Sequence, residues 1–275
     1  MLWWYLCFTG KGKSTLILPE VAQLKINVIS FVIGITAGIF GGLAGLGGGL
    51  VMIPLMAGVL NLNQHKAHGT SLVALVFTGI SGAITYALNG AIDITAAVLI
   101  AVPAIFTAQA GARHAHILPE WKLKKTFGAF LIFCAAILLF KPYLANIIGT
   151  VPGYAKIIVF LITGAFTGFL SGMMGVGGGT IMVPVMVLLA GFTQHVAQGT
   201  SLLVMVPAGA VGAFTHWKMG NVVVGILFGL IPGIIFGTYL GGNLAFLFSD
   251  NILRSIFVVV IIWMGVRYVQ TSAPE

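Results

Sequence analysis

Apolar residues occupy the chain in ten stretches separated by Gly, Pro or charged residues. The stretches fall at about residues 26–45, 49–60, 70–88, 94–112, 126–141, 156–175, 179–190, 200–217, 222–245 and 252–270. Several reach the roughly 17–25 residues that a helix needs to cross a bilayer. The stretches 49–60 and 179–190 are shorter, about 18 Å as helices, so we expect them to be re-entrant or half-depth. This pattern predicts an all-α polytopic membrane protein.

The order of long and short stretches repeats, as five elements followed by five. Aligning residues 38–72 with residues 168–202 without a gap gives 16 identities in 35 positions. The same offset continues beyond that block, for example from Gly111 to Gly241. A duplication therefore covers nearly the whole chain. We predict an N-terminal tail or interfacial segment over residues 1–25, a first membrane repeat over 26–150 and a second membrane repeat over 151–275.

The composition agrees with a lipid environment. Hydrophobic residues make up 59% of the chain and charged residues only 7%, whereas about a quarter of the residues of a soluble domain are charged. The net charge of +8 would suggest nucleic acid as a partner in a soluble protein. Here the basic residues lie in predicted loops and tails, without interleaved aromatic residues, so we expect no nucleic-acid binding.

The distribution of Lys and Arg favours an odd number of crossings in each repeat, because cytoplasmic loops carry an excess of these residues. With odd parity, ten basic residues lie on one side of the membrane and three on the other; with even parity the division is seven against six. The ten are Lys11, Lys13, Lys25, Lys66, Arg113, Lys122, Lys124, Lys125, Lys218 and Arg267, and the three are Lys141, Lys156 and Arg254. Odd parity predicts two inverted-topology repeats with both termini in the cytoplasm.

A glycine-rich run precedes each short stretch, GLGGG at residues 45–49 and GVGGG at residues 175–179. Backbone amides at the start of a helix have no intrahelical partner, and the helix dipole places partial positive charge there, which favours anions. Close helix packing also uses Gly, but three consecutive Gly are costly in a continuous helix. The predicted substrate-binding residues from these runs are Gly47, Gly48, Gly49, Gly177, Gly178 and Gly179.

The pattern Q-H-x-A-x-G-T-S follows each short stretch, at residues 64–71 and 194–201. Two interpretations of its Thr and Ser are open: they cap the amides of the next helix, or they present hydroxyl groups to a ligand. The two His are candidate donors, proton carriers or interfacial residues. The further predicted substrate-binding residues are Gln64, His65, Thr70, Ser71, Gln194, His195, Thr200 and Ser201.

Acidic residues are placed only in tails, loops or element ends, at Glu20, Asp93, Glu120, Asp250 and Glu275. Intramembrane carboxylates are typical of cation transporters, so their lack favours an anionic or neutral substrate. No span carries ligand spacing for a metal, and neither Cys7 nor Cys134 has a partner in a C-x-x-C motif. We therefore expect no metal, no cofactor and no enzymatic activity.

With its paired G-x-G-G-G, M-x-P and G-T-S motifs, the chain resembles the sulfite exporter TauE/SafE family of bacterial membrane proteins over about residues 26–270. The resemblance implies a secondary transporter in the cytoplasmic (inner) membrane that exports small sulfur-containing anions, such as sulfite or organosulfonates. The repetition is imperfect, because His68 corresponds to Gln198 and Tyr86 to His216. Substrate preference is expected at such positions.

The expected partners are a small anionic substrate and the lipid bilayer, and a homodimer is one option for the assembly. The expected mechanism is alternating access at an anion site near the membrane midplane. The alternative functions are an anion channel, a membrane-embedded enzyme or an accessory subunit.

Overall fold

The computed structural model describes residues 20–114 and 153–270, together with some residues between 121 and 139. Its helices are α1 (Glu20–Ala44), α2 (Gly49–Val59), α3 (Gln64–Leu88), α4 (Ile94–His114), α6 (Gly153–Met174), α7 (Gly179–Leu188), α8 (Gln194–Lys218), α9 (Val224–Ala245) and α10 (Asp250–Val269). Seven of these are long and apolar enough to span a membrane, and α2 and α7 are the short ones. The prediction of an all-α polytopic membrane protein is confirmed. The predicted tail up to residue 19 and much of the predicted element at 126–141 lie outside the described residues.

Two long helices begin earlier than the sequence pattern indicated. We predicted spans from 70 and from 200, but α3 begins at Gln64 and α8 at Gln194. The side chains of Asn63 and Thr193 accept hydrogen bonds from backbone amides in the first turn and so cap these helices. The polar run between each cap and the apolar stretch is therefore helical, because it is capped at one end and buried along much of its length.

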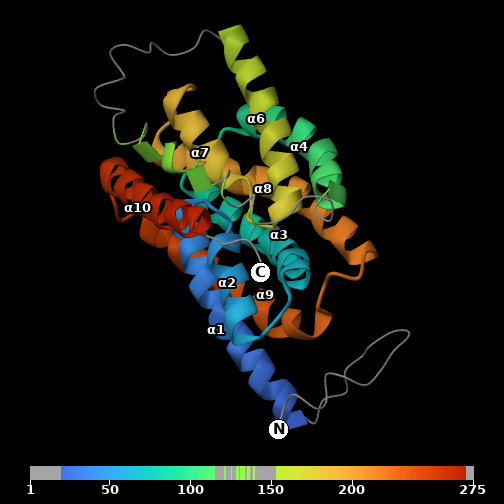
Figure 1. The fold of residues 1–275 in the computed structure, drawn as a ribbon. Coiled ribbons are helices and arrows are strands. Elements are labelled where there is room, and N and C mark those ends of the chain that lie inside the picture. The colour runs from blue at the N-terminus through green and yellow to red at the C-terminus, as the bar shows by residue number, and fades with distance from the viewer. Residues whose placement is uncertain are drawn as a thin grey trace.

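The most extensive helix pairings join the two repeats. Helix α1 packs along α9, and α6 along α4, as Figure 1 shows, with α3 and α8 between the two pairs. The partners run parallel: Gln23 at the start of α1 donates to the carbonyl of Gly225 at the start of α9 (3.1 Å), while Gly42 near the end of α1 meets Gly242. The predicted repeats are thus interleaved in space.

Glycine allows the backbones of α1 and α9 to touch. Along α9, Gly occurs at every fourth residue from Gly229 to Gly241, and each of these Gly lies directly against a backbone carbonyl of α1. The paired carbonyls are those of Asn27, Phe31, Ile35 and Ile39. Membrane helices lack a hydrophobic driving force for association and rely on such close van der Waals contact. Close helix interfaces of this kind commonly form weak Cα–H···O contacts.

Helices α3 and α8, which correspond in the sequence repeat, cross each other in opposite directions. Gly79, in the later half of α3, faces Leu202 and Val206 in the earlier half of α8, while Gly212, near the end of α8, faces Leu72 near the start of α3. Equivalent helices of an inverted pair run in opposite directions through the membrane. This crossing is the arrangement that the predicted inverted topology requires.

The contact between α1 and α9 predicts a difference between two glycines of the same helix. A Cβ added at Gly229 would overlap the carbonyl oxygen of Asn27, whereas a Cβ at Gly225 would meet only Gln23 Nε2, at 3.8 Å. We expect Gly229→Ala to lower the free energy of unfolding by about 1–3 kcal/mol. Gly225→Ala should leave it unchanged or raise it, since Ala is the better helix former.

Thermal unfolding of the two purified variants in detergent measures this difference. Equal midpoints for Gly229→Ala and Gly225→Ala would contradict the backbone contact.

Candidate functional site

Both glycine runs are helix breaks, as predicted. Helix α1 ends at Ala44 and α2 begins at Gly49, with left-handed backbone at Gly45 (φ 66°), Gly47 (φ 82°) and Gly48 (φ 73°). The second break, between α6 and α7, has the same conformation at the two positions equivalent to Gly45 and Gly47. A left-handed backbone costs an L-residue about 1–2 kcal/mol, so these conformations require Gly. We call these segments break 1 (residues 45–49) and break 2 (residues 175–179).

The two breaks are buried and touch each other. A Cβ added at Gly179 would overlap the carbonyl oxygen of Gly45, and a Cβ at Gly49 would lie 2.6 Å from the carbonyl oxygen of Gly175. The start of each short helix therefore faces the carbonyl end of the long helix in the other repeat. Helix ends of opposite partial charge are thus paired across the repeats. In this conformation the positive helix starts are compensated by protein carbonyls.

An apolar pair of side chains lies between the breaks. Leu75 and Met205 occupy equivalent positions in the two repeats. A Cβ added at Gly47 would be 2.5 Å from Leu75 Cδ2 and 2.7 Å from Met205 Sδ, and a Cβ at Gly177 would be 3.4 Å from each of the same atoms. Leu75 and Met205 therefore pack against the middle residue of both breaks.

The predicted serines bind the opposite break. Ser71 Oγ lies 2.8 Å from the carbonyl oxygens of both Gly175 and His68. Ser201 Oγ makes the equivalent contacts at 2.8 Å to Gly45 and Gln198. Each hydroxyl has one proton and donates to one carbonyl at a time. The serines thereby supply donors for carbonyls left unpaired where α1 and α6 end.

The predicted threonines hold loops of the opposite repeat. Thr70 Oγ1 accepts a hydrogen bond from the amide of Val223, just before α9, and Thr200 Oγ1 accepts one from the amide of Asp93, just before α4, both at 3.0 Å. The interpretation of the Thr and Ser as helix caps is wrong, because Asn63 caps α3 and Thr193 caps α8. Their role as substrate ligands stays a prediction.

Two lines of side chains lead from opposite ends of the bundle to the breaks. The α3 line consists of Gln64, His68, Ser71 and Leu75, and the α8 line of Gln194, Gln198, Ser201 and Met205. Residues at this spacing share one helix face. Because α3 and α8 run in opposite directions, the two lines approach the breaks from opposite sides of the membrane region.

The two lines differ in chemistry where the repeat is imperfect. Beside the α8 line, the Tyr86 hydroxyl lies 2.9 Å from the carbonyl of Gly42 and 3.0 Å from Gln198 Oε1. The residue equivalent to Tyr86 is His216, whose Nε2 lies 3.1 Å from the carbonyl of Gly172. The side chains of Tyr86, Gln198 and His216 are all buried. Substrate preference was expected at such positions, but neither Tyr86 nor His216 is among the predicted substrate-binding residues.

His68 replaces Gln198 on the α3 line and is also absent from our predicted site. Its Nε2 lies 3.2 Å from Gln64 Oε1, and its side chain is buried. A polar side chain one helical turn after Gln64 and Gln194 in both repeats is the sequence signal that identifies these two positions.

The structure places His195 at the start of α8, in contact with α9 and α10. Its Nδ1 lies 2.7 Å from Asp250 Oδ1, its Nε2 lies 3.1 Å from the carbonyl of Ala245, and its ring stacks on Phe246. These contacts tie the start of α8 to the end of α9 and the start of α10. His65 is half-buried at the equivalent start of α3. A direct role of either His in substrate binding stays a prediction.

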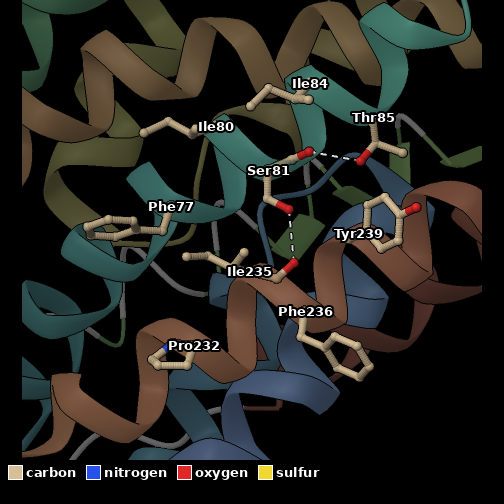
Figure 2. Close-up of a pocket in the computed structure, with 9 residues that line it drawn as sticks. All are labelled: Phe77, Ile80, Ser81, Ile84, Thr85, Pro232, Ile235, Phe236 and Tyr239. Carbon is tan, nitrogen blue, oxygen red and sulfur yellow. Dashed lines mark hydrogen bonds between the residues drawn. The ribbon is translucent and has the colours of Figure 1, made fainter.

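A separate pocket lies between α3 and α9 (Figure 2). It is lined by Phe77, Ile80, Ser81, Ile84, Thr85, Pro232, Ile235, Phe236 and Tyr239. The Ser81 hydroxyl donates to the carbonyl of Ile235 (2.9 Å) and the Thr85 hydroxyl to the carbonyl of Ser81 (2.9 Å), as Figure 2 shows. A mostly apolar lining whose Ser and Thr hydroxyls are already bonded to backbone suits hydrocarbon better than an anion.

Among the residues whose side chains the structure describes, carboxylates lie only at the starts of helices. Asp93 Oδ1 accepts from the amide of Ala96 at the start of α4 (2.9 Å), and Asp250 begins α10. Within the same described residues, no three His, Cys, Asp or Glu side chains gather at one place. The polar groups at the breaks are therefore amides, hydroxyls, imidazoles and backbone.

A bundle of membrane helices with two broken helices meeting in its interior is typical of secondary transporters. The family model of the sulfite exporter TauE/SafE matches residues 30–268. Since that range is most of the chain, the protein belongs to the TauE/SafE family, a family of membrane transporters.

Similar relatives carry the name "Probable membrane transporter protein". YunE of Bacillus subtilis is 27% identical over 264 residues, which cover 88% of this chain and 97% of the relative. YdhB of the same species is 25% identical, with 84% and 94% coverage. MJ0441 of Methanocaldococcus jannaschii is 27% identical, with 74% and 76% coverage. No solved structure matches the chain significantly.

The breaks predict unequal effects of one substitution at two equivalent positions. Gly48 has φ 73°, and its added Cβ would lie 2.5 Å from the carbonyl oxygen of Ala37. Gly178 has φ −83°, and its added Cβ would meet the flexible end of Met182, at 2.5 Å. We expect Gly48→Ala to cost about 2–5 kcal/mol of stability. Gly178→Ala should cost about 1 kcal/mol or less.

The unfolding midpoints of the two variants measure this asymmetry. A Gly178→Ala variant as unstable as Gly48→Ala would show that the two breaks are conformationally equivalent.

Proposed function

We propose that this protein is a secondary transporter of small sulfur-containing anions, such as sulfite or organosulfonates, in the bacterial cytoplasmic membrane. The observation that carries the proposal is the meeting of breaks 1 and 2 in the bundle interior, with a polar line approaching from each side. Irregular backbone survives at membrane depth only where it is buried in protein or lines a cavity. A transporter opens such a segment to each side in turn.

The opposite directions of the equivalent helices α3 and α8 support inverted repeats and alternating access. The opposite directions of α3 and α8 make the α3 line and the α8 line equivalent half-pathways to the two faces of the membrane. Leu75 and Met205 lie between these half-pathways against both breaks, as a closed carrier requires and an open channel does not. With the basic residues counted as above, the α3 line leads to the cytoplasm and both termini are cytoplasmic.

The chemistry at the breaks favours an anion. The described spans place no carboxylate along the two lines, whereas Gln, Ser, Thr and His supply hydrogen-bond donors. Separation of the breaks during transport would also uncover the starts of α2 and α7, which carry partial positive charge. An oxyanion then replaces the protein carbonyls that face these helix starts in the present conformation. These are binding groups, and we propose transport without chemical conversion.

Export follows from the membrane potential. Moving one charge through 100 mV changes its free energy by about 2.3 kcal/mol, so an interior-negative cell drives a monovalent anion outward against a gradient of roughly fifty-fold. A coupling ion is then unnecessary.

Reconstituted liposomes test this function. We expect saturable flux when sulfite, sulfoacetate, taurine, thiosulfate and sulfate are each offered to liposomes that contain the purified protein. Liposomes without protein are the control. For a transported monovalent anion, an interior-negative potential of about 100 mV should give an outside-to-inside ratio near fifty at equilibrium.

The potential separates the mechanisms. An outside-to-inside concentration ratio that does not change with the membrane potential would contradict export by uncoupled movement of a charged substrate. The absence of flux for the whole panel would contradict sulfur-anion transport.

A further inference from the structure

Two glutamines on the α8 line bury amide groups that have no partner among the described residues. Gln194 is 2% exposed, and neither its Nε2 nor its Oε1 is hydrogen-bonded; Gln198 is fully buried, and its Nε2 is not hydrogen-bonded. Buried polar groups in native proteins are almost always paired, because an unmade hydrogen bond costs free energy. Such groups need a hydrogen-bond partner, and a bound ligand can supply one.

Gln198 lies next to break 1. A Cβ added at Gly45 would lie 2.6 Å from Gln198 Cβ, so the Gln198 side chain starts directly at the break. Gln194 precedes it by one turn on the same helix face. The carbonyl oxygen of Gly45 lies against Gly179, the first residue of α7. The next residue, Thr180, has a fully buried hydroxyl that also lacks a partner.

The equivalent positions in the other repeat differ. Gln64 Oε1 is bonded to His68 Nε2 (3.2 Å), and the residue equivalent to Thr180 is the apolar Leu50. Among the described residues, the buried glutamine amides without a partner therefore lie on the α8 line and not on the α3 line. A ligand that accepts several hydrogen bonds fits this side of the breaks.

We infer that a small oxyanion binds against the α8 line, with its oxygens accepting hydrogen bonds from the Nε2 groups of Gln194 and Gln198. The Thr180 hydroxyl, one residue after Gly179 at the start of α7, is a further buried donor without a partner. Oε1 of Gln194 is an acceptor, so the site suits an anion that also carries a hydrogen-bond donor, as hydrogen sulfite and amine-bearing sulfonates do. This assignment rests on the proposed function and names the half-pathway that holds the substrate in this conformation.

Thermal unfolding in detergent with increasing sulfite tests the assignment, with Gln194→Leu and Gln198→Leu as the variants. Each should lose the sulfite-dependent rise in Tm, with an apparent affinity at least about tenfold weaker than wild type. Without sulfite, Gln194→Leu should unfold at the wild-type Tm or above it, because it removes a buried unpaired amide. Gln109→Leu, an exposed glutamine on α4, is the matched control and should keep the wild-type response.

A third variant distinguishes loss of sulfite binding from loss of the fold. Gln198→His places at this position the side chain that the other repeat carries at His68, and it should keep a donor and the response to sulfite. If Gln194→Leu and Gln198→Leu respond to sulfite as wild type does, the amides hold water only and the assignment is wrong. A Gln194→Leu variant that is destabilised without sulfite also overturns it.

The proposed function fails separately, when wild-type protein neither transports nor responds to sulfite or any of the other four compounds of the panel. If Gln194→Leu and Gln198→Leu transport the substrate as wild type does, only the assignment of the two glutamines is wrong.

Discussion

The structure depends on how backbone polar groups are satisfied where α1 and α6 stop inside the bundle. Each break leaves carbonyls and amides without intrahelical partners, and unpaired groups at membrane depth cost several kcal/mol each. The protein meets this constraint across the repeats. Ser71 and Ser201 reach carbonyls of the opposite break, and the start of each short helix abuts the opposite carbonyl end. Each repeat therefore completes the hydrogen bonding of the other.

The helix pairs around the breaks explain how the arrangement is held in place. Helices α1 and α9, and likewise α4 and α6, touch backbone to backbone through regularly spaced Gly, which leaves little room for sliding. The short helices α2 and α7 lack such a partner among the described elements. In transport by alternating access, these rigid pairs then move about α3 and α8, and the two breaks separate in each transport cycle.

The sequence predicted the parts of this arrangement that are local. Glycine runs, the Pro in each short helix and the repeat offset are visible in the residues themselves, so the breaks and both short helices were correctly predicted. The roles of Ser71 and Ser201 were not predicted, because their hydrogen-bond partners lie 104 and 156 residues away in the sequence. The pairing of His195 with Asp250 likewise joins helices that are distant in sequence. Gly48 and Gly178 are equivalent in sequence, yet only Gly48 is left-handed, since the conformation follows from different neighbours.

The central claim is that the two interlocked breaks separate and rejoin as the substrate passes. Hydrogen–deuterium exchange of backbone amides in residues 45–49 and 175–179, followed by mass spectrometry with and without sulfite, tests it most directly. We expect measurable exchange at both breaks in the absence of sulfite and a change in protection there when sulfite is added. We also expect no change in the paired helices α1 and α9. Breaks that stay protected under both conditions, while the protein transports sulfite in liposomes, would contradict the central claim.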